Sequence, residues 1–158
     1  MSEKKAEVPA YIEALKAKII EVNFLDEEMI MSFEPSSDYC HSNGTIIQGG
    51  FITTMLDCSM AFLVMELTEF QKTPMSIDIN VNFLSAGSPG RVIAKSKIIK
   101  LGKSIGFISA ELFQNEKKIA TASSSIKLAS FPGINFLKDN VGKNAKIAVS
   151  YTHLRAHE

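Results

Sequence analysis

The sequence lacks the features that would place it in several large classes of protein. Two cysteines, Cys40 and Cys58, are too few for a disulfide framework, so we expect a cytoplasmic protein with free thiols. The 17 basic and 17 acidic residues balance, which leaves no surplus charge for nucleic acid. Asp57 and Glu66 interrupt the longest apolar run, so no membrane span is expected. The first ten residues, MSEKKAEVPA, lack the apolar core of a signal peptide.

Motifs for metal and phosphate binding are also missing. No His, Cys and carboxylate residues are grouped with the spacing of metal ligands. The pair Gly49-Gly50 lacks the further glycine and the lysine of a P-loop. We therefore expect neither a metal nor a bound cofactor.

The first half of the chain shows mainly helical periodicity. Apolar residues recur at helical spacing in residues 10–23, which predicts an N-terminal helix there. A short strand is predicted at 29–33, followed by a loop over 38–48. A second helix is expected to begin at Gly49 or Gly50 and to end near residue 70. Because most of its positions are apolar, this helix should be buried on most sides.

After Pro74 the period changes from 3.6 to 2. Apolar and polar residues alternate through 75–83, which predicts a half-buried strand with Ser76 and Asp78 on its polar face. Further strands are predicted at 91–100, 103–113 and 119–128. We expect a single α+β domain over residues 1–148, with its core at about 28–129. In it, an antiparallel sheet would wrap around the central helix.

A lone carboxylate, Asp57, lies within the apolar helix. No Lys or Arg is within helical reach of it, and a buried carboxylate is costly unless it is paired or hydrogen-bonded. Asp57 could simply face solvent or bond a neighbouring backbone group. However, the helix starts with Gly49-Gly50, and a helix N-terminus presents unpaired N–H groups and partial positive charge. Such a terminus can polarise a carbonyl oxygen, and a carboxylate two turns further on could supply the nucleophile or base.

The segment IIQGGFITTMLDCSM (46–60) resembles the central helix of hotdog-fold acyl-CoA thioesterases, in particular the phenylacetate-pathway (PaaI-type) group of the 4-hydroxybenzoyl-CoA thioesterase-like superfamily. INVNFLSAGSPG (79–90) and KLGKSIGFISAEL (100–112) resemble the strand, turn and hairpin that follow the helix in that family. The resemblance covers about residues 28–129. It implies a hotdog fold and hydrolysis of acyl-CoA, with CoA as part of the substrate rather than a cofactor.

The resemblance also implies roles for individual residues. The Gly50 N–H would hold the thioester carbonyl oxygen, and Asp57 would attack the carbonyl carbon or activate a water. Gly49 and Thr54 are expected to contact the substrate. The site would lie at a dimer interface, in a homodimer or homotetramer, and acyl-CoA would be the partner, with no membrane and no nucleic acid.

The chain departs from the family pattern before the helix. Gln48 stands where the family has His; it can hydrogen-bond a substrate but cannot act as a base. The loop Asn of the family would be expected at Ser42, and Asn43 is one position closer to the helix. A shortened loop could still present Asn43 to the substrate, and His41 or Ser42 could serve instead.

Three polar residues flank the turn between the meander strands predicted at 91–100 and 103–113. They are Lys100, Lys103 and Ser104. They could form a solvated hairpin tip. They could also contact CoA phosphates, as the corresponding hairpin does in related thioesterases.

Two other functions remain open at this point. A non-catalytic acyl-CoA-binding or sensing domain would keep the pocket and could lose the carboxylate. A hotdog hydratase or dehydratase would need a His beside a carboxylate, and His41 is the candidate. The last ten residues, 149–158, resemble translated read-through of a sequencing adapter, so we expect a non-native or disordered tail.

Overall fold

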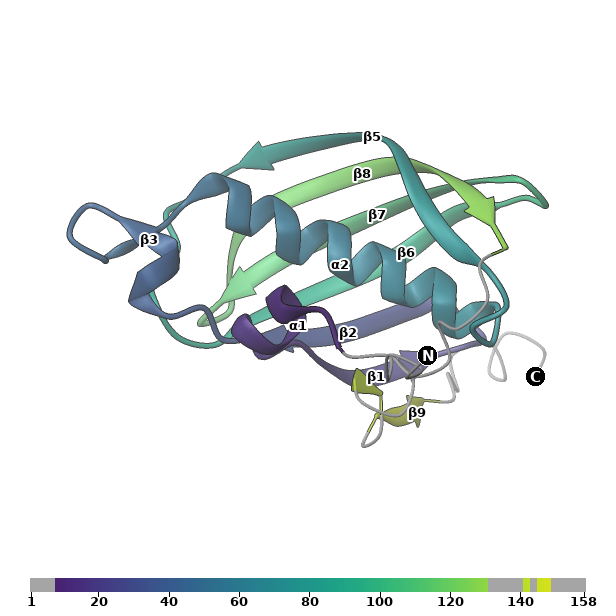
Figure 1. Ribbon diagram of the computed structural model, residues 1–158, viewed down its shortest axis with the longest axis horizontal. Coiled ribbons are helices and arrows are strands. Elements are labelled where there is room, and N and C mark those ends of the chain that lie inside the picture. Colours follow the sequence, from purple (N-terminus) through teal and green to yellow (C-terminus); the bar gives the residue numbers. More distant parts are fainter. Residues whose placement is uncertain (1–7, 131–140, 143–144, 149–158) are drawn as a thin grey trace, which may run out of the picture.

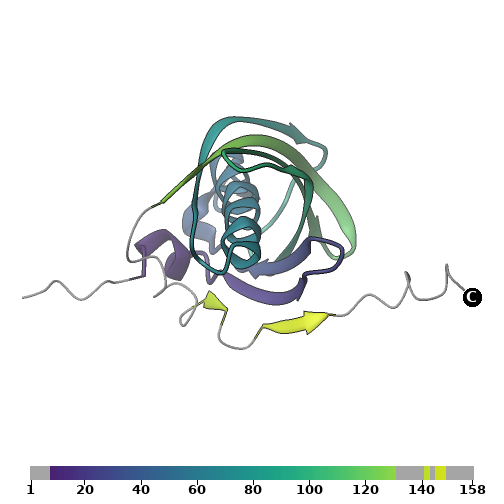
Figure 2. The same ribbon diagram turned by 90° about the vertical axis from the view of Figure 1, so that its right-hand side faces the viewer.

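The computed structural model describes residues 8–130, 141–142 and 145–148, and the expected tail at 149–158 lies outside them. Within the described residues, a seven-stranded sheet curves around one long helix, α2 (Figures 1 and 2). The strand order is β5-β8-β7-β6-β2-β1-β9, and neighbours are antiparallel except for β1 and β9. The elements are α1 Ala10–Ala14, β1 Lys18–Asn23, β2 Glu28–Phe33, β3 Cys40–His41, β4 Ile46–Ile47, α2 Gly49–Leu67, β5 Thr73–Phe83, β6 Val92–Leu101, β7 Ile105–Gln114, β8 Lys117–Ala129 and β9 Lys146–Ala148, with a 3-10 turn at Ser37–Tyr39.

The predicted α+β class is confirmed, and so are the central helix and the four strands that follow it, to within a few residues. The predicted meander of these four strands is wrong in its first strand, because β5 pairs with β8 and only β6, β7 and β8 follow one another in the sheet. The inner surface of the sheet carries small residues on its central strands, among them Ala94, Ala110 and Ala122, all buried. They let the helix backbone lie close to the sheet. The Ser96 hydroxyl donates to the Ser59 carbonyl of α2 at 3.2 Å across this contact. Close packing of this kind holds α2 rigidly, and with it every group that it carries.

The predicted N-terminal helix over 10–23 is wrong in its extent. The helix ends at Ala14, the backbone turns at Lys16 (φ 50°), and residues 18–23 form β1. The β-branched Ile19, Ile20 and Val22 favour a strand, and β1 pairs with β2 from Lys18 to Asn23 with one irregularity at Ile20. The sheet therefore begins before the predicted core at residue 28. It also continues into β9, which pairs in parallel with β1 and which the sequence did not predict.

Strand β5 forms one edge of the sheet and contains a bulge. Ser76 lies opposite Ile126, whereas Asp78 lies opposite Ser125, so Ile77 is the extra residue. Since Ile126 and Ser125 point to opposite faces, Ser76 and Asp78 also do. The predicted polar face shared by Ser76 and Asp78 is therefore wrong: the bulge turns Ser76 toward α2 and leaves Asp78 on the outer face.

Among the described residues, α2 alone has the length and composition of a helix that could cross a membrane. Its most apolar stretch is 56% buried inside the fold, beneath the sheet. A core helix passes the same test of length and composition. Asp57 is half-buried on this helix rather than enclosed beneath the sheet.

Candidate active site

The carboxylate of Asp57 is held by a residue from the neighbouring strand. The Ser76 hydroxyl donates a hydrogen bond of 2.8 Å to Asp57 Oδ1. This bond fixes one carboxylate oxygen and leaves the other free to act, an arrangement that suits a nucleophile or a general base. Sequence reasoning missed Ser76, because strict alternation along β5 places it on the outer face.

Asp57 opens onto a cavity of about 470 Å³ between α1 and α2. Thr54 lies beside it in the wall, and its hydroxyl donates to the Gly50 carbonyl at 2.9 Å. Tyr11 of α1 lines the same cavity. Burial of its hydroxyl, and to a smaller extent the nearby Cys58 and Asp57, raise its pKa. Burial, with Asp57 contributing, also raises the pKa of the Cys58 thiol. Both groups are therefore uncharged at neutral pH. Within the described residues, no cluster of His, Cys, Asp or Glu could hold a metal ion.

The start of α2 is capped by its own sequence. Gln48 is the N-cap residue, and its Oε1 accepts a hydrogen bond of 2.7 Å from the Gly50 N–H. The donor that was predicted to hold a carbonyl oxygen is therefore engaged by Gln48 in this structure. Among the described residues the Gly49 N–H has no such partner. Gly49 thus presents the free donor at the positive end of the helix.

A second cavity, of about 380 Å³, lies at this end of α2. Its lining includes His41, Gly49 and Phe83, so the structure brings His41 and Gly49 to one cavity. The ring of Phe83 lies against Gly49, where an added Cβ would meet it at 3.2 Å. The His41 Nδ1 is 2.9 Å from the Ser42 hydroxyl. Asn43 is exposed with φ 57°, and no described side chain hydrogen-bonds to it, so its proposed contact with the substrate stays a prediction.

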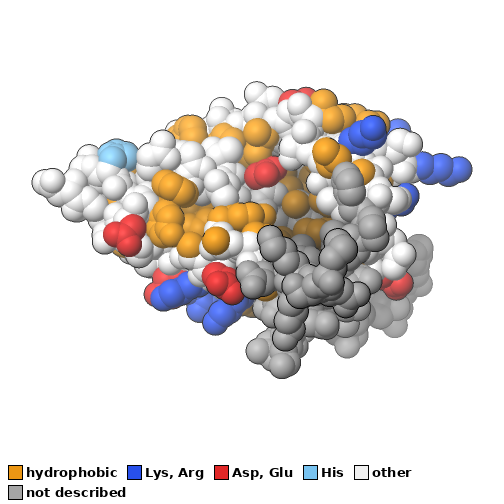
Figure 3. Space-filling model, in the orientation of Figure 1, with side chains coloured by type: hydrophobic (Ala, Val, Ile, Leu, Met, Phe, Trp, Pro, Cys, Tyr) orange, Lys and Arg blue, Asp and Glu red, His pale blue; other side chains and the backbone are white. Residues whose placement is uncertain are grey.

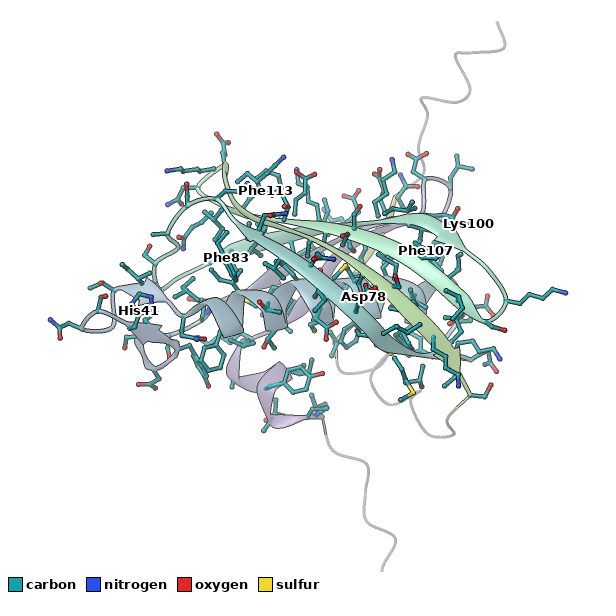
Figure 4. The ribbon with its side chains drawn as sticks, turned by 90° about the horizontal axis from the view of Figure 1, so that it is seen from above. His41, Asp78, Phe83, Lys100, Phe107 and Phe113 are labelled. Atoms are coloured by element: carbon teal, nitrogen blue, oxygen red, sulfur yellow. The ribbon has the colours of Figure 1, made fainter. Side chains whose placement is uncertain are left out.

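The hairpin residues Lys100, Lys103 and Ser104 are exposed at the junction of β6 and β7. They lie far from the start of α2: Figure 4 shows Lys100 at one end of the molecule and His41 at the other. No described carboxylate forms an ion pair with either lysine. Within one chain, the structure therefore does not bring this hairpin to the helix N-terminus.

Comparison with known proteins agrees with this geometry. The model of the thioesterase superfamily matches residues 44–121, which run from the loop before α2 into β8. This chain belongs to the thioesterase superfamily. Mouse acyl-coenzyme A thioesterase 13 is 26% identical over 106 residues, which make up 66% of this chain and 74% of the mouse protein. Together the family and this relative identify the chain as a thioester hydrolase.

Solved structures confirm the hotdog fold of this thioesterase. A phenylacetic acid degradation-related protein from Ralstonia eutropha JMP134 superposes with a TM-score of 0.72 at 24% identity, over 78% of this chain and 93% of that one. The PaaI protein of the E. coli phenylacetic acid degradation operon superposes with a TM-score of 0.65 at 17% identity, over 77% and 85% of the two chains. The sheet wrapped around α2 is therefore the hotdog architecture that the sequence resemblance implied.

Replacing Ser76 tests whether it positions the carboxylate of the thioesterase. We expect Ser76→Ala to lower kcat by about ten- to a hundredfold, the effect of losing one hydrogen bond to a charged group, with little change in KM. Ser76→Thr should restore part of the loss because it keeps the hydroxyl. Steady-state kinetics of CoA release would measure both variants.

The chain offers a matched control for this variant. The Ser125 hydroxyl donates to Asp78 Oδ2 at 3.2 Å on the outer face of the sheet, so Ser125→Ala removes a similar Ser–Asp bond away from the site. If Ser76→Ala and Ser125→Ala have the same small effect on kcat, Ser76 does not position Asp57 for catalysis.

Proposed function

We propose that this thioesterase hydrolyses acyl-CoA to the free acid and CoA in a site built from two chains. Asp57 of one chain attacks the thioester carbonyl carbon or activates a water. The N–H of Gly49 in the other chain holds the carbonyl oxygen, joined by the Gly50 N–H when the Gln48 side chain turns aside. One observation carries the proposal. The Asp57 carboxylate, hydrogen-bonded to Ser76, lines a cavity, and the helix that carries Asp57 starts with the free N–H of Gly49.

One chain does not place these two groups on one substrate. Gly49 and Asp57 are eight residues apart on α2, which separates them by about 12 Å along the helix axis. The carbon and oxygen of a carbonyl are only about 1.2 Å apart, and each must be reached from about 3 Å. A second copy of α2, running antiparallel to the first, places Gly49 of one chain beside Asp57 of the other. For the two helices to pair in this way, the two-fold axis must pass near Thr53, which is midway between Gly49 and Asp57 along α2.

Strand β5 supports the same axis. Ser76 is bonded to Asp57 and Phe83 lies against Gly49, so the middle of this stretch of β5 is at Asn80 or its neighbour. In the described residues β5 is the edge strand at its end of the sheet, with one side unpaired. Pairing of β5 with its counterpart about this axis would extend the sheet across the dimer and cover the exposed ring of Phe83.

The same proposed symmetry would also give the remaining predicted residues a role. The hairpin with Lys100 and Lys103 lies toward the end of its own chain where α2 finishes (Figure 4). In an antiparallel pair it comes to the end where the partner's α2 begins. There its two lysines and Ser104 would meet the phosphates of CoA, while His41 and Asn43 flank the entrance at the start of the helix.

The test is release of CoA by the purified protein from a panel of aromatic, short-chain and long-chain acyl-CoAs. Turnover of at least one member by the wild type is the expected result. The hydratase alternative predicts a change in absorbance of an enoyl-CoA without a free thiol. Binding of acyl-CoA without turnover of any panel member would replace the proposal with the non-catalytic binding domain.

A further inference from the structure

We propose that the cavity between α1 and α2 is a groove for the acyl chain, which selects uncharged acyl groups of about eight to ten carbons. The proposal rests on the proposed function and adds to it a substrate class and the residues that set chain length. Ala61 and Met65 of α2 form the far part of the groove, and Tyr11 of α1 forms the wall opposite Asp57.

The groove follows one face of α2. Its α2 residues recur at intervals of three and four, which is the spacing of a single stripe along a helix. The stripe begins beside the candidate catalytic carboxylate and runs toward the end of the helix. From α2 it comprises Thr54, Asp57, Cys58, Ala61, Phe62 and Met65, and α1 and the residue before it add Pro9, Tyr11 and Ile12. Figure 3 shows hydrophobic side chains gathered where α1 lies against α2.

Chain length follows from the length of this stripe. Asp57 and Met65 are eight residues apart, or about 12 Å along the axis. An extended chain of about ten carbons has this length, given bonds of about 1.5 Å in a zigzag. The cavity of about 470 Å³ has the volume of an ordinary small-ligand site. Phe62 and Met65 are almost fully buried, so they form a fixed floor and end rather than mobile surface side chains.

The charge of the groove defines the class of acyl group. Beyond Asp57, the residues that line it are apolar or uncharged, since the Tyr11 and Cys58 hydrogens stay on at neutral pH. A dicarboxylic acyl group would bring its free carboxylate toward Asp57 or into an apolar wall, both of which are unfavourable. Tyr11 is 50% exposed at the edge of the groove, where its ring can cover an acyl chain.

The test compares chain-length profiles of wild type and Ala61→Phe. The added ring fills the groove between Asp57 and Met65, so we expect kcat/KM for octanoyl-CoA and decanoyl-CoA to fall about a hundredfold relative to butyryl-CoA, from the loss of about four methylene contacts. The matched control is Ala14→Phe, at an exposed residue of α1 that does not line the groove. Its profile should equal that of the wild type, and the thermal midpoints of both variants would show that they fold.

A binding measurement separates this inference from the proposed function. The thioethers S-octyl-CoA and S-butyl-CoA resist hydrolysis, so their affinities report on the groove alone. Tighter binding of the octyl compound by the wild type, lost in Ala61→Phe, supports the groove even if no acyl-CoA is hydrolysed. An Ala61→Phe variant that keeps the wild-type ratio of affinities, or a wild type that binds both thioethers equally, overturns it.

Discussion

Replacement of Asp57 by Ala should lower the rate of CoA release by at least about a thousandfold, the range expected when a nucleophile or general base is removed. No other described carboxylate lines the cavity between the two helices, so none can take its place. The fold should survive, because Asp57 is half-buried and its one described bond is to Ser76. Initial rates at high enzyme concentration, with the thermal midpoint as a check on folding, measure both expectations.

Asp78 provides the control for this substitution. It is two residues from Ser76 but on the outer face, where it accepts from the backbone and hydroxyl of Ser125. Asp78→Ala removes a carboxylate of the same strand region without touching the cavity and should retain activity. Near-normal turnover by Asp57→Ala, or an equal loss in both variants, would show that the carboxylate on α2 is a structural group.

The parts of the fold that could be predicted are those with a repeated local pattern. The apolar run of α2 and the alternation in the later strands are each visible within a single segment. The prediction of one helix over residues 10–23 was wrong for a related reason. A short helix followed at once by a short strand produces apolar spacings that resemble those of one long helix. The turn at Lys16 that separates them carries no Gly, Pro or Asn to mark it.

The site was predictable only where a residue's neighbours lie on its own helix. The spacing of Asp57, Gly49 and Gly50 could be predicted because all three lie on α2. Ser76 was not, because a one-residue bulge reverses the face of β5 and nothing in the alternation of residues 75–83 signals it. Tyr11 was missed because its position opposite Asp57 depends on how α1 packs against α2, which is a long-range contact.

The two-chain site leads to the second large effect, which requires a variant that removes the Gly49 N–H and keeps the helix. Proline at this position also adds ring carbons beside Phe83, whose exposed side chain must shift by a few tenths of an ångström. Gly49 is the first residue of α2, a position that proline accepts because its missing N–H has no partner within the helix. Gln48 before it is already extended (φ −66°, ψ 137°), the conformation that a following proline requires. Gly49→Pro should therefore keep the helix, delete the proposed donor and inactivate the enzyme by about a hundredfold or more.

Mixed dimers of Gly49→Pro and Asp57→Ala should then regain activity. In a mixed dimer, one site combines an intact Gly49 with an intact Asp57, and the other carries both changes. Equal amounts of two inactive variants, unfolded and refolded together, form about half mixed dimers at random, so about a quarter of the wild-type sites should return. If Gly49 and Asp57 served one substrate within a single chain, no site would be intact and the mixture would stay inactive.

In the reciprocal mixture we expect a loss of activity instead of a gain. This mixture controls for activity that refolding alone restores. Wild type refolded with an equal amount of the double variant Gly49→Pro/Asp57→Ala should show about a quarter of the activity of a sample in which all the chains are wild type, since each mixed dimer has one defect at each site. A site within one chain would instead keep about half, because every wild-type chain would remain active whatever its partner. The two mixtures together thus distinguish a shared site from a separate one by activity alone.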